Sequence, residues 1–215
     1  MSKITLTVQD ALAKKKIIET RISDLNISRL AYVSVATELQ DNIGGLKRSD
    51  YESKLQSNFD MVDSLISNLR AIKSAINASN AVTKITIAGK EYTCADAIAR
   101  LRALDTEKGF YVAIKNQIDK CQKEIETRNS KVLDPDNVSE YIGRILGSET
   151  KKTDSLYEEI LERYKKDNLL YLVDPKHLSE KVESRITEVA EFEAQVHNAL
   201  VASNITTTIE VELED

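Results

Sequence analysis

Apolar residues recur at intervals of three and four through most of this chain, the spacing that gathers side chains on one face of an α-helix. The first such segment predicts a helix from about Val8 to Leu25, with these residues facing inward: Ala11, Leu12, Ile18, Ile22 and Leu25. The next segment, RLAYVSVATEL at 29–39, fits a strand or a helix equally well. The loop QDNIGGLKR then turns the chain at Gly44-Gly45.

A longer helix is predicted after this loop. It opens on the sequence Ser49-Asp50-Tyr51-Glu52, a capping-box pattern. Two apolar seams run along the helix, one through Leu55, Phe59, Val62, Ile66 and Leu69 and the other through Val62, Leu65, Leu69, Ile72 and Ile76. A face this wide predicts contacts with more than one neighbouring helix.

The second half of the chain begins with a β-hairpin predicted at 84–93, where KITIAGKEYT alternates around Ala88-Gly89. A third helix is expected to reach about Arg128, with one apolar face: Tyr111, Ile114, Ile118, Cys121 and Ile125. The last long helix is predicted to open at Asp174-Pro175 and to run to about Ala202. The sequence TTTIEVEL then closes the chain as a strand.

Two motifs occur twice, in the same order. TVQDALAKKK at 7–16 matches TCADAIARLR at 93–102, and each begins with a threonine that can cap a helix followed by an aspartate near its positive end. ASNAVTKITI at 78–87 matches ASNITTTIEV at 202–211, and the apolar positions of the preceding helices share its register. Chance recurrence of similar helix ends is the alternative. Two ordered matches favour an internal duplication.

The spacing of these motifs locates an insertion. Thr7 and Thr93 are 86 positions apart, whereas Thr83 and Thr207 are 124 apart, so the second copy carries about 38 extra residues. We therefore expect one domain, 1–215, made of repeat one at about 3–88 and repeat two at about 89–215, with an inserted arm at about 131–173. That arm begins with the loop KVLDPDN and contains the helical stretch TDSLYEEILERYKKD and the apolar run LLYLV.

The duplication also predicts how the chain ends meet. If a pseudo-twofold axis relates the repeats, the terminal strands KITLT and TIEVEL pair antiparallel and copy the central hairpin. The predicted fold class is mainly α (α+β), an elongated helical bundle with two short antiparallel β-ribbons.

Composition narrows the class of protein. The net charge of −5 disfavours a nucleic-acid-binding surface, which needs a dense array of cations. No apolar run approaches the roughly 18 residues of a membrane span, and the start of the chain lacks a signal-peptide core. Cys94 and Cys121 fit reduced thiols better than a disulfide framework. We expect a cytoplasmic protein that binds neither nucleic acid nor membrane.

Catalytic and metal-binding patterns are missing from the sequence. His177 and His197 are expected to lie about 30 Å apart on one helix, too far to share a metal. No nucleophile elbow, phosphate loop, dinucleotide fingerprint or zinc spacing occurs. The carboxylates are best interpreted as solvated charge, although a carboxylate-based hydrolase stays open as a less favoured alternative. We expect no enzyme activity and no cofactor.

One set of polar residues indicates a site for a small anion. Pseudo-symmetry could bring together duplicated cations and the polar groups near the strand ends: Lys14, Lys16, Asn80, Thr83, Arg100, Arg102, Asn204 and Thr207. Such a cluster would bind phosphate through charge-assisted hydrogen bonds. Cations paired with nearby carboxylates, and polar groups capping helix ends, explain the same residues without a ligand.

The stretch INASNAVTKITIAGKEYTCADAIARLRAL at 76–104 resembles the septicolysin-like family of small helical proteins from bacteria and their phages. The matching positions are Ile76, Asn77, Ser79, Asn80, Thr83, Thr93, Asp96, Ala97, Ile98, Ala99 and Arg100. With the opening DALAKKKIIETRI, the likeness covers roughly 8–125, whereas 130–215 extend beyond it. The resemblance implies a helical, oligomeric protein of phage origin, found in the host cytoplasm.

These patterns favour a non-catalytic binding or assembly protein that acts through helix faces and forms a homo-oligomer or binds a protein partner. The alternative is a protein that sequesters a small, nucleotide-like anion.

Overall fold

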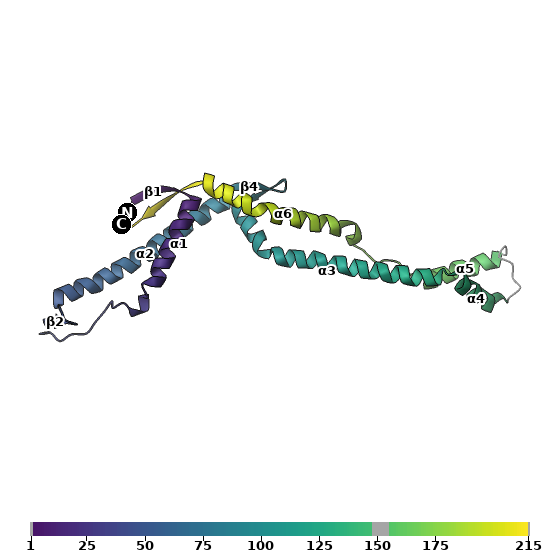
Figure 1. Cartoon of the computed structure of the whole chain (residues 1–215), viewed down its shortest axis with the longest axis horizontal. Coiled ribbons are helices and arrows are strands. Elements are labelled where there is room, and N and C mark those ends of the chain that lie inside the picture. The colour runs from purple at the N-terminus through teal and green to yellow at the C-terminus, as the bar shows by residue number, and fades with distance from the viewer. Residues whose placement is uncertain (1, 148–154, 215) are drawn as a thin grey trace. The chain divides into compact units, whose positions relative to one another are not determined.

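The computed structural model describes residues 2–147 and 155–214 of the chain (Figure 1). Its α-helices are α1 Val8–Asp24, α2 Arg48–Val82, α3 Cys94–Val132, α4 Pro135–Leu146, α5 Ser155–Asn168 and α6 Leu178–Thr206, with a short 3-10 helix at Ile27–Arg29. Its strands are β1 Ser2–Thr7, β2 Asn42–Ile43, β3 Leu46–Lys47, β4 Lys84–Ile87, β5 Lys90–Thr93 and β6 Thr208–Leu213. The predicted mainly helical bundle with short antiparallel ribbons is confirmed.

The chain divides into two compact units. The first unit comprises Met1–Arg102 and Phe192–Asp215, and the second comprises Ala103–Glu191. The predicted grouping of 1–215 into one domain, and the predicted boundaries of the repeats and the arm, stay predictions.

The prediction that the chain ends pair is confirmed. Strands β1 and β6 are antiparallel, with Thr7 opposite Thr208 and Ser2 opposite Leu213 (Figure 1). Strands β4 and β5 form the predicted central hairpin, with Thr93 opposite Lys84. The two ribbons share one register, because offsets of 86 and 124 convert each pair of β1 and β6 at 4–7 into a pair of β5 and β4.

The helix starts that follow the two ribbons have the same hydrogen bonds. In α1 the Thr7 hydroxyl accepts from the Asp10 amide at 3.0 Å and donates to the Asp10 carboxylate at 2.7 Å. At the start of α3, Thr93 and Asp96 make the same two bonds at the same distances. This reciprocal cap satisfies amides that the helix leaves unpaired, so the shared motif acts as a helix start, as predicted.

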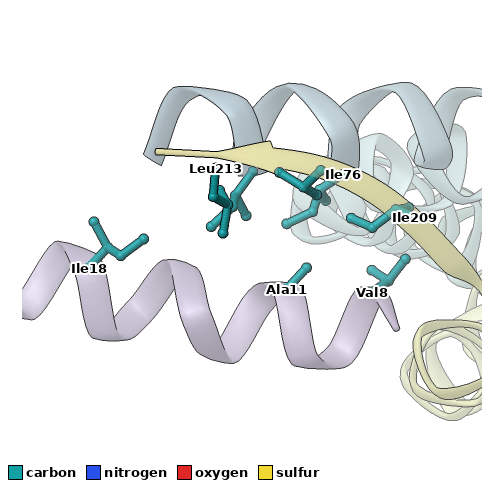
Figure 2. Close-up of a cluster of buried hydrophobic side chains, with 8 residues drawn as sticks. Val8, Ala11, Ile18, Ile76, Ile209 and Leu213 are labelled. Atoms are coloured by element: carbon teal, nitrogen blue, oxygen red, sulfur yellow. The ribbon is translucent and has the colours of Figure 1, made fainter. Parts of the chain in front are cut away.

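The core of the first unit lies between α1, α2 and β6. Figure 2 shows Val8, Ala11 and Ile18 of α1 facing Ile76 of α2 and the strand β6. The buried cluster also contains Ile72 and three residues of β6: Ile209, Val211 and Leu213. Every second residue of β6 is buried and the alternate ones are exposed, as expected for a strand covered on one face. The last strand of the chain therefore completes the core of its first two helices.

Several of the buried positions of this core recur in the other half of the chain. In the offsets of the two motifs, Val8 corresponds to Cys94, Ala11 to Ala97 and Ile18 to Leu104, and all six are buried. Buried Ile72 and Val211 likewise correspond to buried Val196 and Ile87. Leu12 is an exception to the predicted inward face of α1, because it is exposed and Val8 is buried in its place.

Helix α2 begins earlier than the predicted capping box. It starts at Arg48 after Lys47, which makes no side-chain cap, and the Ser49 hydroxyl contacts the Asp50 carboxylate instead of a backbone amide. The capping-box interpretation is therefore wrong. The preceding residues Asn42–Lys47 form the small hairpin β2–β3, with the expected turn at Gly44-Gly45, where φ is 58° and 81°. Positive φ at both turn positions explains why glycine occupies them.

Arg29 ends the 3-10 helix and residues 30–39 are neither strand nor helix, so both interpretations of the segment 29–39 are wrong. Apolar side chains of this segment point to solvent, and Val33 is 87% exposed. Alternating apolar residues stabilise a strand only where a partner strand or a core covers them, and no described strand pairs with this segment.

The arm has more helix than the sequence predicted. The loop predicted at KVLDPDN ends early, because α4 begins at Pro135 with Asp134 as its cap. Proline at the first helical position after a capping aspartate is a favourable helix start. Helix α5 matches the predicted helical stretch at 153–167 and extends one residue beyond it, to Asn168; residues 153 and 154 lie outside the described residues. Residues 169–173 have no regular structure.

Two asparagines fasten irregular backbone onto long helices. The Asn129 side chain of α3 donates to the Leu170 carbonyl at 2.9 Å and accepts from the Leu170 amide at 2.8 Å. On α2, Asn68 donates to the Glu214 carbonyl at 3.0 Å and accepts from the Glu214 amide at 2.7 Å. Each carboxamide both donates to and accepts from the backbone of one residue, as a neighbouring β-strand would. Each side chain therefore fixes the position of that residue.

The predicted aspartate cap of the last helix is correct, but the helix starts later than predicted. Helix α6 begins at Leu178, and the Asp174 carboxylate accepts from the Ser179 and Leu178 amides at 2.8 Å each. The hydrogen bond from the Ser179 amide contributes most to lowering the pKa of Asp174, from 3.8 to about 2.

This lowered pKa makes a prediction about stability and pH. Because the folded pKa lies below the unfolded value, ionised Asp174 stabilises the fold fully above about pH 5, and that contribution is lost as the pH falls towards about 2. We expect the difference in unfolding free energy between the wild type and Asp174→Asn to shrink as the pH falls through this window. Urea unfolding followed by circular dichroism measures it, and a difference that stays constant down to about pH 2 would contradict the assignment.

Candidate functional site

The residues predicted to hold an anion have separate surroundings. Arg100 lies over the Phe192 ring, with its guanidinium carbon 4.4 Å from the ring centroid, and it donates to the Tyr92 hydroxyl at 2.6 Å. Tyr92 and Phe192 also meet edge to face at 5.5 Å. Lys14 is half-buried on α1, Lys16 is exposed on the same helix, and Arg102 is exposed on α3. Arg100 therefore has a packing role in the core of the first unit.

The two threonines of the predicted site also have structural roles. The amide of Thr83 donates to the Ser79 carbonyl and that of Thr207 to the Ser203 carbonyl, both at 2.9 Å. Each threonine carbonyl then accepts, at 2.9 Å, from the first amide of the adjoining helix, Cys94 for Thr83 and Val8 for Thr207. These bonds join the end of one helix to the start of the next through a ribbon.

Thr83 and Thr207 come together in one shallow pocket of about 420 Å³. Its described lining contains no lysine or arginine and includes the carboxylate of Glu210. Asn80 and Asn204 are half-buried near the ends of α2 and α6 and are not part of this lining. The structure thus brings together two of the eight predicted residues, in a pocket without positive charge.

The potential metal-binding side chains are dispersed within the described residues. They contain no group of three or more His, Cys, Asp or Glu side chains arranged to hold a metal ion. Glu188, one of a pair of acids on a common face of α6, accepts from Arg185 at 3.1 Å. Both cysteines are free, with Cys94 buried and Cys121 exposed.

An apolar groove along α2 is the most distinctive surface of the first unit. We call it the α2 groove: it encloses about 920 Å³ and is lined by Ile27, Tyr32, Val33, Leu55, Phe59, Val62 and Ile66, with Glu52, Gln56, Asp60 and Asp63 at its polar positions. Phe59 is 56% exposed and Ile66 is 40% exposed. A contiguous group of large apolar side chains exposed to solvent is typical of an interaction surface.

The chain segment between α1 and α2 forms one wall of the α2 groove and is held by hydrogen bonds within itself and with α2. Asn58 donates to the Ala31 carbonyl at 2.9 Å, and the Tyr32 hydroxyl donates to the Ile27 carbonyl at 3.0 Å. Further along, the Arg48 amide donates to the Asp41 carbonyl at 2.8 Å, and its guanidinium reaches the Glu38 carbonyl. The irregular segment therefore lies along α2 without covering its exposed seam.

The predicted pair of apolar seams explains how the groove arises. Val62, Leu65, Leu69, Ile72 and Ile76 form the seam that is buried or partly buried in the first unit. The seam through Leu55, Phe59 and Ile66 lies in the groove, although Val62 belongs to both. The sequence indicated a face wide enough for more than one neighbouring helix, and in the described chain helix α1 and strand β6 cover the second seam.

A second, polar cavity of about 870 Å³ lies on the adjacent face of α2. Its lining combines one cation, Arg21, with the carboxylates Asp24, Asp60 and Glu214 and with hydroxyl and amide groups. The Ser67 hydroxyl donates to the Glu214 carboxylate at 2.9 Å beside it. Its apolar lining residues are Leu25, Met61 and Leu65, fewer than those of the α2 groove.

Among the described residues, no helix is long and apolar enough to pass through a lipid bilayer. No protein-family model, no curated protein and no solved structure matches this chain, so the geometry of its surfaces is the basis for a proposal about function.

Proposed function

We propose that this chain is a non-catalytic assembly protein that self-associates through the α2 groove. The observation that carries the proposal is the exposed apolar seam of α2, in which Phe59 and Ile66 remain open to solvent. Transfer of such side chains out of water contributes about 25 cal/mol per Å² buried, which favours association over exposure.

The total exposed area supports the proposal. The chain exposes 15255 Å², whereas a compact monomer of 215 residues exposes about 10,000 Å². Even two separate compact bodies with the sizes of the two units would together expose about 12,000 Å². The excess therefore does not depend on how the units are placed, and it exceeds the area that a standard protein interface buries.

The charge around the α2 groove indicates which surface of a second copy fits it. The groove carries three carboxylates, Glu52, Asp60 and Asp63, so a second α2 would bring like charges together. Helix α3 offers a surface of different composition, where Phe110 is 60% exposed and its neighbours Gly109 and Tyr111 carry no charge. We propose that this segment of one copy occupies the groove of another.

A contact between two different surfaces has a consequence for size. In a pair of copies joined by such a heterologous contact, one copy keeps a free groove and the other keeps a free α3 segment. Further copies can therefore add until a ring closes or a filament forms. The resemblance to the septicolysin-like family supports the same proposal, because it implies an oligomeric helical protein. Phage origin and a cytoplasmic location belong to this proposal and rest on that resemblance and on the reduced cysteines.

Paired charge substitutions test the proposed contact. We expect Phe59→Glu and Phe110→Glu each to reduce the mass measured by light scattering to that of a monomer, because each places a carboxylate in an apolar interface. The matched control is Ile205→Glu on α6, which alters a side chain 53% exposed and outside the groove. Equal loss of mass in the control, or unchanged mass in Phe59→Glu, would refute the groove as the association surface.

A further inference from the structure

The second unit contains a cavity whose lining differs in charge from the rest of the chain. The cavity encloses about 640 Å³ between α3, α4 and α5, and we call it the arm cavity. Its lining residues are Lys123, Glu124, Thr127, Arg128, Lys131, Val132, Asn137, Glu140, Tyr141, Arg144 and Tyr164. None of them belongs to the eight residues that the sequence indicated for an anion.

Positive charge predominates in the arm cavity. Four cations face two carboxylates, in a chain whose net charge is −5. Arg144 pairs with Glu140, one turn away on α4. Within the described part of the chain, no ion pair engages Lys123, Arg128 or Lys131. Residues 123, 127 and 131 lie on one face of α3 at intervals of four, which presents two ammonium groups and a hydroxyl to the same space.

Two tyrosines form the apolar side of the same cavity. The rings of Tyr141 on α4 and Tyr164 on α5 lie 4.4 Å apart at an interplanar angle of 36°. Tyr164 is buried, as are Val132 and Ile142, so this ring pair is held in place by the packing of three helices. Asn137 fixes the start of α4 by donating to the Lys131 carbonyl at 2.8 Å.

We infer that the arm cavity binds a small phosphorylated molecule that carries an aromatic ring, the chemical class of the mononucleotides. Ammonium and guanidinium groups donate charge-assisted hydrogen bonds to phosphate oxygens, and the partly exposed ring of Tyr141, backed by buried Tyr164, can pack against a flat base. A volume of about 640 Å³ lies within the range of small-molecule pockets. The site is separate from the α2 groove, so it adds a ligand to an assembly protein.

Calorimetric titration of the full chain with ADP, pyrophosphate and adenosine tests the inference. We expect saturable binding of ADP at low ionic strength, with an affinity at least about tenfold greater than that of either fragment, because phosphate and ring contacts act together. Arg128→Gln and Lys131→Gln are each expected to weaken ADP binding about tenfold, since each removes a charge-assisted hydrogen bond. Lys120→Gln is the matched control, on the exposed surface of α3 outside the cavity.

Each outcome decides for or against the inference. Loss of ADP binding in Arg128→Gln and Lys131→Gln, with unchanged helix content by circular dichroism and normal binding in Lys120→Gln, supports the site. No saturable heat with ADP, or equal weakening in all three variants, overturns it. Pyrophosphate binding as tightly as ADP overturns the role given to the tyrosines. Failure of the Phe59→Glu test leaves these results unaffected, because the two sites share no residue.

Discussion

The Val211→Asp substitution is expected to unfold the first compact unit at neutral pH. Val211 is 3% exposed and lies in the cluster that β6 forms with α1 and α2. Aspartate loses the buried valine contacts and places a charge where the described core contains no cation to pair with it. We expect a loss of more than about 3 kcal/mol in unfolding free energy, a large fraction of the stability of a small domain.

The alternate face of the same strand provides the control for this substitution. Thr208 is exposed on β6, so Thr208→Asp introduces the same side chain without burying it, and we expect a change within about 0.5 kcal/mol. Urea denaturation followed by far-ultraviolet circular dichroism compares the variants. Equal stability of Val211→Asp and Thr208→Asp would show that β6 is not packed as a core strand.

The second large effect is expected for Phe192→Ala. Phe192 is 1% exposed and packs beside Tyr92 and beneath the guanidinium of Arg100. Truncation removes the ring and leaves a cavity, which costs about 3–5 kcal/mol for a buried phenylalanine. It also removes the aromatic partner of a partly buried cation.

A truncation to alanine at an exposed position of the same helix controls for the change in helix propensity that both substitutions cause. Ile205 is 53% exposed on α6, and Ile205→Ala is expected to change stability by less than about 0.5 kcal/mol. The melting temperatures of both variants, compared with that of the wild type, measure the two changes in stability. A Phe192→Ala protein that melts with the wild type would contradict the packing of Phe192 against Tyr92 and Arg100.

In the predicted repeats, whose second motifs are 124 positions apart, Asn68 corresponds to Phe192. In one copy this position holds a buried ring that supports Arg100, and in the other it holds an amide that fixes the end of the terminal strand. The matched helix starts and ribbons are retained while this contact differs. The contrast fits two copies that share backbone junctions and have diverged in side-chain packing.

The junctions could be predicted from the sequence because their signals are local. Thr7 and Thr93 each precede an aspartate by three residues, and that spacing alone produces the reciprocal cap. Ala88-Gly89 marks the hairpin because both residues adopt positive φ. Pairing of the chain ends could be predicted because the terminal strands match the two strands of the central hairpin in the predicted repeats, and the hairpin strands pair with each other.

Other elements could not be predicted because tertiary context decides them. Residues 29–39 alternate like a strand, but side chains of α2 such as Asn58 hold the segment as an irregular wall. The helix start at Pro135 is a different case, because its signal is local: Asp134 caps the helix and proline occupies the first helical position. Ser49 has the composition of a cap, yet the hairpin before α2 moves the helix start to Arg48.

The candidate sites were predictable only in part. The apolar seam through Phe59 was visible in the sequence, but which of two seams would stay open depends on where α1 and β6 pack. The predicted anion residues were grouped by symmetry, and symmetry does not ensure that side chains point to one space. Lys123, Arg128 and Lys131 had a visible helical spacing, but their partners Tyr141 and Tyr164 come from helices whose packing the sequence does not specify.

The central claim is that the chain folds one plan twice and that its own ends form the second ribbon. Oxidation of a Thr5→Cys, Glu210→Cys pair in a Cys121→Ser background tests it directly, because Thr5 and Glu210 lie opposite each other in β1 and β6. We predict a disulfide within one chain, found by mass spectrometry as linked N- and C-terminal peptides. Free thiols at positions 5 and 210 after oxidation, or a disulfide formed only between two chains, would contradict the claim.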